Sequence, residues 1–447
     1  MNRRKFIVQA GAAVAGGTLA PFARAWPQSA PDVNLEIAPL ALEIAPRKIV
    51  HTVAYNGRVP GPLIRWPEGK PITIEVTNRT NIPELVHSHG LWIPSEMDGS
   101  DEEGTPMIAP GAQFRYAFTP RPAGFRWYHT HIFAGHDYKR STYSGEFGCF
   151  YVEPKNDPGA YDQEIFLTLH DWNAFPSASG DASMEVAYEY GTIDGRMLGF
   201  GDPIRVREGQ RVLFHFLNAS ASLVHWLALT GHEFTIVAMD GNRVFNSKDV
   251  RAIRLGPAER IDAVVSMRQP GVWILGETRE SLQKAGMGIV VEYANQQGKP
   301  KWVEPPEITW DYRPFASAKA VIREPDEIIP LKFESKFHGQ GALDSWMING
   351  KSYPHTDELH LRQGRRYRLQ MINHSTDDHP LHLHRHTFEV TKLGGTPVSG
   401  LLKDVLMVPA NETAEVDFTA DNPGATLFHC HNQTHMDFGF MMLFRYV

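Results

Sequence analysis

Three stretches of the 447-residue chain repeat one pattern, and this repetition constrains the fold more than any other feature. Each has a turn ending in glycine, then a strand alternating apolar and polar residues, then an asparagine, then a segment containing histidine. The alternating strands are 72–78, 211–218 and 367–373. Alternation with period two is typical of a strand with one buried face. Gly, Pro and Asn turns are frequent, and no long helical period appears. The sequence therefore predicts an all-β chain of three Greek-key β-sandwiches.

The segment His429-Cys430-His431, followed by His435, predicts two metal sites that share one tripeptide. Neighbouring side chains of a strand point to opposite faces, so the two flanking histidines face one side and the cysteine faces the other. A thiolate with two imidazole ligands suits copper in its trigonal blue-copper arrangement. A structural zinc site is the alternative for such a cluster, but it usually uses more than one cysteine.

Three further clusters each contain two histidines one residue apart, which places two imidazoles on one face of a strand. They are His87-Ser88-His89, His129-Thr130-His131 and His379-Pro380-Leu381-His382-Leu383-His384. One such pair is a weak signal, but four clusters, two towards each end of the chain, favour a metal centre between the first and last units. The middle unit has His225 and His232 without such a pair, and we expect both to be structural.

These clusters resemble those of the multicopper oxidases, a family that includes laccases, ascorbate oxidase and bacterial metal oxidases. The similarity runs from about residue 45 to the C-terminus and includes Tyr55-Asn56-Gly57-Arg58-Val59-Pro60-Gly61-Pro62 and Met347-Ile348-Asn349-Gly350-Lys351. The resemblance, to the bacterial laccase-like three-domain type, implies three cupredoxin-like domains and four coppers per chain, namely one type 1, one type 2 and two type 3. It implies an enzyme that couples four one-electron oxidations of a donor to the reduction of O2 to water.

The resemblance also implies a role for each metal-binding residue. The type 1 copper would be held by His379, Cys430 and His435, and the type 2 copper by His87 and His382. The type 3 pair would be held by six histidines whose division between the two coppers stays open, namely His89, His129, His131, His384, His429 and His431. Cys430 and His435 would carry electrons, and Asp98 matches the family's acid near the three-copper cluster.

Two positions depart from the family pattern. Phe440 stands ten residues after Cys430, where the family often has an axial methionine, so we expect a type 1 site with a non-ligating residue there. Met441 or Met442 is the alternative axial ligand. Met436 follows His435 where several bacterial relatives have a carboxylate that helps proton delivery. The sequence leaves open whether Asp437 or another group replaces that carboxylate.

The donor is expected to be a phenol or an aromatic amine. A metal oxidase for Mn(II), Cu(I) or Fe(II) is the alternative, although the 14 methionines are scattered, whereas copper-oxidising relatives often carry a Met-rich insert. A non-catalytic exported protein of cupredoxin fold is a remote alternative, because all eleven expected ligand positions are filled. His136 and His386 are expected to lie outside the ligand set.

The N-terminus predicts export. Arg3-Arg4-Lys5-Phe6 precedes a weakly apolar stretch at 7–22, and Ala23-Arg24-Ala25 offers a cleavage site. Paired arginines indicate the twin-arginine route, and the stretch is shorter than the ~20 residues of a membrane span. We expect a signal peptide at 1–25 and a periplasmic or secreted mature protein without a membrane span. Three domains at 26–155, 156–296 and 331–447, with a Pro-rich connector at 297–330, would follow.

Charge and cysteine content narrow the partners. The net charge of −7, without a basic run beyond the N-terminus, gives no reason to expect nucleic acid. The expected partners are a small electron donor, O2 and the export machinery. The chain has two cysteines. Cys149 lies in an apolar run and is predicted to be a buried free thiol, so we expect no disulfide.

Overall fold

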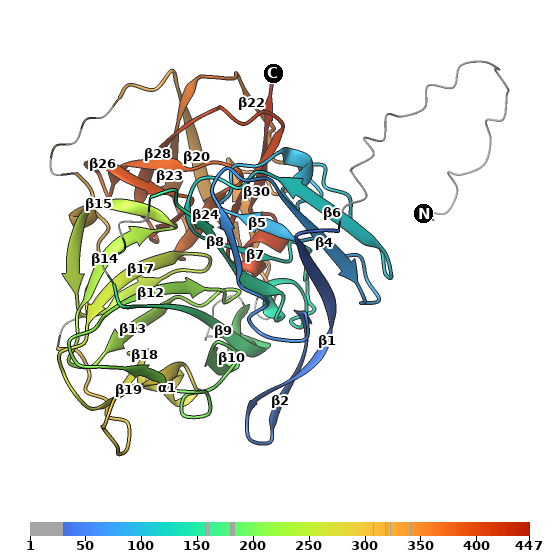
Figure 1. Ribbon diagram of the computed structural model, residues 1–447. Coiled ribbons are helices and arrows are strands. Elements are labelled where there is room, and N and C mark those ends of the chain that lie inside the picture. The colour runs from blue at the N-terminus through green and yellow to red at the C-terminus, as the bar shows by residue number, and fades with distance from the viewer. Residues whose placement is uncertain are drawn as a thin grey trace, which may run out of the picture.

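The computed structural model describes residues 30–447 except 157–158, 160, 179–183, 307, 318, 320, 322 and 340–341. The predicted signal peptide at 1–25 therefore lies outside the described residues. The described chain forms six sheets that pair into three β-sandwiches, coloured blue to teal, green to yellow, and orange to red along the chain (Figure 1). The all-β prediction of three cupredoxin-like Greek-key domains is confirmed.

Each sandwich pairs two sheets, and the strands of each sheet are named in their spatial order. In the first sandwich, one sheet has the order β2 (Lys48–Tyr55), β1 (Val33–Ala45), β4 (Ile72–Asn78), β6 (Gln113–Phe118). The facing sheet has the order β3 (Ile64–Pro67), β8 (Phe147–Glu153), β7 (Gly124–His129), β5 (His87–His89). In the middle sandwich, one sheet has the order β10 (Met184–Ile193), β9 (Gln163–Ala178), β12 (Arg211–Asn218), β17 (Arg260–Ser266), β14 (Phe234–Met239), β15 (Asn242–Val250). The facing sheet has the order β11 (Ile204–Val206), β19 (Gly288–Tyr293), β18 (Val272–Glu277), β13 (His225–Leu229), β16 (Ile253–Leu255). In the last sandwich, one sheet has the order β21 (Ser345–Ile348), β20 (Glu327–Lys336), β23 (Arg366–Asn373), β28 (Thr413–Thr419), β25 (Phe388–Leu393), β26 (Thr396–Lys403). The facing sheet has the order β22 (Leu359–Leu361), β30 (Met441–Tyr446), β29 (Ala425–Cys430), β24 (His379–Leu383), β27 (Val405–Val408).

The three sandwiches repeat one topology. In each, the alternating strand pairs in parallel with the sandwich's opening strand, as β4 does with β1, β12 with β9, and β23 with β20. The histidine-bearing strand lies in the opposite sheet, at β5, β13 and β24. Strand β20 begins at Glu327, so residues 327–330 of the predicted connector already belong to the last sandwich.

The repeated asparagine anchors each sandwich. The Asn78 Nδ2 donates to the carbonyls of Ile82 and Ile108, at 2.7 and 2.8 Å. Asn218 and Asn373 make equivalent pairs of bonds at the ends of β12 and β23. All three side chains are buried, so each amide satisfies carbonyls that water cannot reach. The repeated asparagine therefore fixes the loop that leads to each histidine-bearing strand.

Helices are short in the part of the chain that the structure describes. Two α-helices, α1 (Glu280–Lys284) and α2 (Gln433–Asp437), and three 3-10 turns, η1 (Ser95–Met97), η2 (Ser141–Tyr143) and η3 (Arg313–Phe315), are present there. No helix of that part has the length and apolarity that crossing a membrane requires.

Apolar packing joins the sandwiches unequally. One continuous core runs through the middle and last sandwiches, from Leu167 to Phe444. The first sandwich has a core of its own, and a smaller apolar cluster that includes Phe125 and Trp172 joins it to the middle sandwich. In the centre of the molecule, β5 and β7 of the first sandwich lie beside β24 of the last (Figure 1). The functional side chains gather at that junction.

Candidate metal centres

Three of the predicted residues form a compact site in the last sandwich, which we call the cysteine site. The Cys430 Sγ lies 3.5 Å from His435 Nδ1 and 3.7 Å from His379 Nδ1, and these two nitrogens are 3.1 Å apart. Cys430 ends β29, and α2 then turns the chain back, because the Asn432 side chain accepts the Thr434 N–H and caps the helix. This turn brings His435 onto the cysteine.

The two histidines of the cysteine site are held differently. The His379 Nε2 bonds the Ser375 hydroxyl at 2.7 Å, in the buried interior. The His435 ring stacks on Trp346 at 3.8 Å between centroids, and its Nε2 lies 3.2 Å from the Asn432 Nδ2. Residue His435 is 8% exposed whereas His379 and Cys430 are fully buried, so the His435 ring is the site's edge towards solvent.

Phe440 packs beside the cysteine site. It is fully buried, and its ring centroid lies 4.8 Å from that of His379. Met441 packs in a separate small apolar cluster with Met436, so its side chain leaves the site, as strand alternation predicts. Met442 belongs to the large core that also contains Phe440.

The other eight predicted histidines converge at the junction of the first and last sandwiches, and we call them the histidine cluster. Each is at most 6% exposed. Six of them have an Nε2 that is buried and without a hydrogen-bond partner among the described residues: His87, His89, His129, His131, His382 and His431. Buried polar atoms are nearly always satisfied, so such a set calls for a ligand. Imidazole nitrogens are donors that copper accepts, and the residues therefore fit copper.

Outer hydrogen bonds set the orientation of these rings. The Nδ1 atoms of His129 and His429 bond main-chain carbonyls at 2.7 and 2.9 Å, and those of His87 and His382 do so at 2.9 and 2.7 Å. An Nδ1–H that donates outward leaves the Nε2 lone pair pointing inward. Burial, with repulsion from neighbouring imidazoles, lowers the pKa of His129, His382 and His429 well below the ordinary value. The rings are therefore neutral and able to bind a metal.

Several groups within the histidine cluster bring their rings close together. His131, His384 and His429 bring ligand atoms within 4.8 Å of one another, and the Nε2 atoms of the last two are 3.0 Å apart. The His89, His129 and His431 rings lie 5.2 to 5.7 Å apart. His87 and His382, one from each sandwich, have centroids 5.8 Å apart. These groups overlap with others, since His87 also forms such a group with His382 and His384, so distances alone leave the six histidines undivided.

Cys430 links the two centres. Its neighbours His429 and His431 both belong to the histidine cluster, although β29 ends at Cys430 and His431 lies beyond the strand. The Cys430 side chain points the other way, to His379 and His435. The predicted covalent path between a thiolate site and a histidine site is therefore present.

Asp98 lies against the histidine cluster, as the sequence predicts. Its Oδ2 is 2.7 Å from His384 Nδ1 and 2.9 Å from His87 Nδ1. Gly99 follows with φ +94°, and an added Cβ would lie 1.9 Å from the Val86 carbonyl oxygen, so only glycine allows this close approach. Burial raises the pKa of Asp98, but the two histidines outweigh it and hold the pKa well below the ordinary value.

Glu103 is a neighbour that the sequence did not indicate. Its side chain is fully buried, with Oε2 3.4 Å from His384 Nδ1 and Oε1 accepting the Leu427 N–H at 2.6 Å. Burial, together with the adjacent Asp98 carboxylate, raises the pKa of Glu103 well above the ordinary value. Nothing in its local sequence marks it, because its importance comes from a contact with residue 384.

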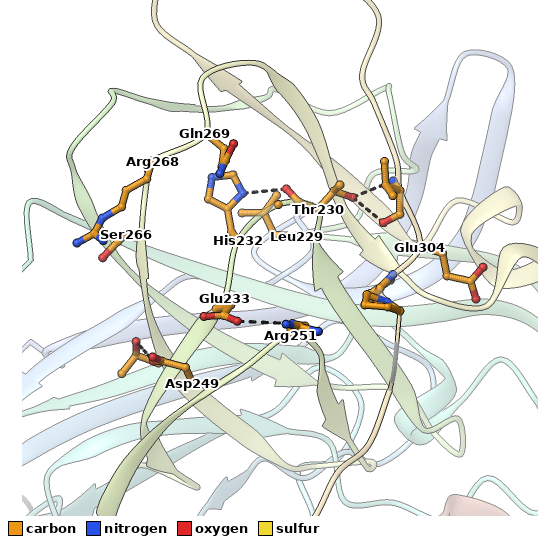
Figure 2. Close-up of a pocket in the computed structure, with 15 residues that line it drawn as sticks. Leu229, Thr230, His232, Glu233, Asp249, Arg251, Ser266, Arg268, Gln269 and Glu304 are labelled. Carbon is orange, nitrogen blue, oxygen red and sulfur yellow. Dashed lines mark hydrogen bonds and ion pairs between the residues drawn. The ribbon is translucent and has the colours of Figure 1, made fainter.

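The remaining histidines of interest are satisfied within the protein. His225 bonds Asp171 and Glu277 through its two ring nitrogens, at 2.8 and 2.9 Å. His232 lines a surface hollow of the middle sandwich, where its Nδ1 bonds the Thr230 carbonyl at 2.9 Å (Figure 2). That hollow mixes charges of both signs and contains none of the predicted metal ligands. The His232 Nε2 bonds the Tyr293 hydroxyl at 2.5 Å, so neither His225 nor His232 has a free nitrogen for a metal.

Three other sequence expectations fall on described residues. His386 bonds the His384 carbonyl and the Tyr446 hydroxyl, and His136 is exposed beside Phe438. Cys149 is a buried free thiol, as predicted, and Cys430 is also free. Asp437 accepts the Ala134 and Gly135 N–H groups at 2.9 and 2.7 Å and has no recorded contact with the histidine cluster.

Sequence profiles of the multicopper oxidase family match residues 41–157, 164–294 and 329–447. The chain is 30% identical over 438 residues to multicopper oxidase MmcO of Mycobacterium tuberculosis, covering 89% of this chain and 84% of that protein. It is 26% identical to Laccase-2 of Fomitopsis schrenkii, covering 88% of this chain and 85% of that protein. The structure of Fet3p, described as a multicopper oxidase that functions in iron import, superposes with a TM-score of 0.79 at 20% identity, covering 93% and 90%.

Fold, thiolate site and histidine cluster together define a copper-dependent oxidase. The chain belongs to the multicopper oxidase family, whose profiles account for all three sandwiches. Copper is its cofactor, with four ions typical of the family, and the histidine and cysteine groups are compatible with that number.

Proposed function

We propose that this enzyme is a laccase-like oxidase of phenols and aromatic amines. Four donor molecules each give up one electron, and one O2 with four electrons and four protons becomes two water molecules. The observation that carries this proposal is the setting of His435, which contacts Cys430 on one side and lines a cavity of about 210 Å3 on the other. An aromatic donor in that cavity lies one side chain away from the thiolate.

The geometry favours one assignment of the copper ligands. The cysteine site would hold the type 1 copper, and His87 with His382 the type 2 copper. One type 3 copper would take His131, His384 and His429, and the other His89, His129 and His431, following the distances above. Bound copper would supply one-electron oxidation at the cysteine site and the reduction of O2 at the histidine cluster.

The protein's part is to move electrons, hold protons and exclude water. His435 receives the electron from the donor, and Cys430 passes it through the main chain to His429 and His431. Asp98 orients His384 and His87 and holds a proton position at its Oδ2, beside the oxygen-binding cluster. Complete burial of the cluster keeps partly reduced oxygen from escaping.

The donor cavity combines an aromatic wall with an acidic rim. Trp346, which stacks on His435, lines the cavity with a small part of its ring, since the residue is 4% exposed. Glu185, Asp344 and Asp377 also line the cavity, and the described residues form no recorded ion pair with them. Burial and the neighbouring carboxylates raise the pKa of Asp377. Neutral and cationic donors are therefore favoured over anionic ones.

The same acidic rim favours a second candidate, oxidation of a metal ion such as Fe(II), Mn(II) or Cu(I). Carboxylates are suitable ligands for a hydrated divalent cation. The similarity to Fet3p, a multicopper oxidase that functions in iron import, supports this candidate. The scattered methionines weigh against Cu(I), for which soft sulfur ligands are suited.

A donor panel separates the two candidates. Copper-loaded enzyme is given a neutral methoxyphenol, a cationic aromatic diamine, a sulfonated phenol and Fe(II), and kcat/KM is measured with oxygen uptake. We expect turnover of the first two at four donors per O2 and about tenfold weaker use of the sulfonated phenol, equivalent to ~1.4 kcal/mol. Fe(II) turnover without aromatic turnover would instead establish the metal oxidase.

Two variants serve as controls for this panel. Cys430→Ser removes the thiolate, so it should lose the blue absorption and the oxidation of every donor while retaining copper in the histidine cluster. Asp377→Asn removes one rim charge, so it should raise KM for the cationic diamine and leave KM for the methoxyphenol unchanged.

We also propose, from the N-terminal sequence, that the enzyme is exported to the periplasm or beyond.

A further inference from the structure

Six charged side chains from all three sandwiches form a buried charge cluster beside the histidine cluster. They are Arg126 from the first, Asp240, Glu259 and Arg260 from the middle, and Lys403 and Asp404 from the last sandwich. Each is at most 1% exposed, and the three cations balance the three anions. Apolar residues of similar volume often stabilise an interior at least as well as buried ion pairs. The cluster is therefore poorly explained by stability alone.

Asp404 lies at the centre of this charge cluster and is held on every side. The Arg260 Nη1 and Nη2 donate to its two carboxylate oxygens, both at 2.6 Å, in a bidentate pair. The Arg126 Nη1 donates to its Oδ2 at 3.3 Å. On the main-chain side, the Asp240 carboxylate accepts the N–H groups of Asp404 and Val405, at 3.3 and 3.1 Å. The Asp404 side chain is thus confined to one orientation.

Asp404 contacts one histidine from each of the outer sandwiches. Its Oδ1 lies 3.6 Å from His89 Nδ1, and its carbonyl oxygen accepts the His382 Nδ1–H at 2.7 Å. The His89 and His382 rings are stacked, with centroids 3.7 Å apart and planes 14° apart. Their Nε2 atoms are both buried and without a partner among the described residues. One residue therefore controls two neighbouring rings, by its side chain and by its main chain.

Arg260 reaches the same place from the middle sandwich. Its Nη1 is 3.4 Å from His89 Nδ1, but both are donors when Nε2 faces a metal, so the acceptor that faces His89 Nδ1 is the Asp404 carboxylate, at 3.6 Å. Room for the pair depends on Gly90, which follows His89 with φ +80°. An added Cβ there would lie 2.5 Å from Asp404 Oδ2 and 2.7 Å from Arg260 Nη2. The glycine after the first histidine pair thus makes space for a residue of another domain.

We propose that Arg260 is a positioning residue for the oxygen-reducing centre: through Asp404 it fixes the rings of His89 and His382, so the copper-free middle sandwich sets ligand geometry between the other two. The inference rests on the proposed function, in which both histidines bind copper. Outer partners of metal-binding histidines fix ring orientation and typically contribute 10–100-fold to metal affinity or activity. Arg260 would act on both rings through a single carboxylate.

The test compares two arginine variants that each break a bidentate pair with a buried aspartate. Arg260→Lys keeps the positive charge but loses the bidentate pair of hydrogen bonds to Asp404. Arg368→Lys does the same to the pair of Arg368 with Asp417, whose bonds are 2.7 and 3.1 Å, within the last sandwich. No recorded contact joins Arg368 or Asp417 to a described histidine of either centre. Copper content, the blue band and the EPR signal of the type 2 copper are followed as a chelator is added.

We expect Arg260→Lys to lose cluster copper at a chelator concentration about 10–100-fold lower than wild type, with an altered type 2 EPR signal. Its blue band should persist, because the cysteine site lies within the last sandwich. Arg368→Lys should match wild type in all three. Wild-type copper retention and EPR in Arg260→Lys would overturn the proposal. Parallel loss of the blue band and of cluster copper would mean general unfolding, and the second variant below then decides.

A second variant keeps the test decisive if Arg260→Lys fails to fold. Asp404→Asn preserves the shape and the carbonyl bond to His382 but removes the charge facing His89. It should weaken cluster copper in the same direction, and an unchanged copper affinity would contradict the proposal. Wild-type protein that cannot hold four coppers would instead contradict the proposed function, and that result is seen before any variant is made.

Discussion

At the scale of single residues, we predict that Phe440 sets how strongly copper in the cysteine site attracts electrons. A thioether at the axial position donates weakly to copper and stabilises the oxidised state, whereas a phenyl ring cannot donate and keeps the site dry. The buried Phe440 ring packs edge-on against His379. Both effects favour Cu(I), so we expect a high reduction potential and access to donors that are harder to oxidise.

Phe440→Met tests this expectation by redox titration of the blue band. We predict a lower potential than wild type, because the new thioether can reach the copper. The matched change Phe333→Met introduces a methionine at the ring that packs on Phe440, 5.0 Å away, and should shift the potential less. An unchanged or higher potential in Phe440→Met would mean that another residue, such as Met442, already serves as the axial ligand.

A separate prediction concerns Asp98 and the half-reaction in which O2 is reduced. Asp98→Asn keeps the size but removes the charge at 2.7 Å from His384 and the proton position there. Reoxidation of reduced enzyme by O2 should slow by ~10²–10⁴-fold, the usual range for a general acid. Stopped-flow measurement of the two half-reactions should find reduction by the donor nearly unchanged. Equal slowing of both half-reactions would remove Asp98 from proton delivery.

Residue spacing predicted which side chains would come together because each motif is local. His87 with His89, or His429 with Cys430, lie on one short strand, so alternation alone predicts their faces. Glu103, Asp404 and Arg260 carry no local signal, since each acts on a histidine far away in sequence. Their roles depend on how the sandwiches pack, which a single sequence does not reveal.

At the scale of elements, a pair of buried acids holds the loop between β7 and β8, which carries His131. Glu84 precedes β5, and Glu146 precedes β8. The Thr130 hydroxyl donates to Glu84 at 3.3 Å, the Thr130 N–H donates to the Glu146 carbonyl at 3.1 Å, and the two acid side chains interact directly. Two buried carboxyl groups in contact favour sharing a proton.

We predict that this acid pair makes the free energy of unfolding depend on pH. Burial raises the pKa of Glu84 to about 7, and burial with the charge of Glu84 raises the pKa of Glu146 well above its ordinary value; Arg140 opposes both shifts. In the unfolded chain both acids titrate near pH ~4.3. The folded state therefore holds more protons from about pH 4.3 to at least about pH 7, and stability falls as pH rises through that window.

Glu146→Gln removes the shared proton, so its free energy of unfolding should fall less steeply with pH than that of wild type. Urea denaturation at several pH values across the same window measures both slopes. The exposed Glu208→Gln is the matched control and should keep the wild-type slope. A wild-type slope in Glu146→Gln would mean that the acid pair is not linked to folding.

Elements were predictable to different degrees. The strands 72–78, 211–218 and 367–373 match β4, β12 and β23 within one residue, because alternation reflects one-sided burial. The five-residue α2 was not predicted, since it is too short for a helical period, yet it places His435 on Cys430. The domain boundaries at 155/156 and 296/297 stay predictions from the sequence.

At the scale of the whole molecule, copper is expected to strengthen the junction between the first and last sandwiches, which share little apolar packing. The middle and last sandwiches share one apolar core, whereas the first has its own and shares a smaller cluster, with Phe125 and Trp172, mainly with the middle sandwich. The histidine cluster draws four residues from the first sandwich and four from the last, so copper bound there would bridge them. The residues of the cysteine site all come from the last sandwich, so copper bound there would bridge no two sandwiches.

Copper removal should therefore uncouple the first sandwich. A ligand that binds only the folded state stabilises it by about 2.7 kcal/mol at a concentration 100 times its Kd, and here that stabilisation spans the junction. Calorimetry of apo-enzyme should show an early transition that copper-loaded enzyme lacks, with hydrogen exchange in β4 and β6 rising first. Cys430→Ser, which keeps cluster copper, should unfold without the early transition, whereas His384→Ala should show it. A single transition in apo-enzyme would show that the sandwiches are joined by packing and that cluster copper adds no link between them. An early transition in Cys430→Ser but not in His384→Ala would show the same.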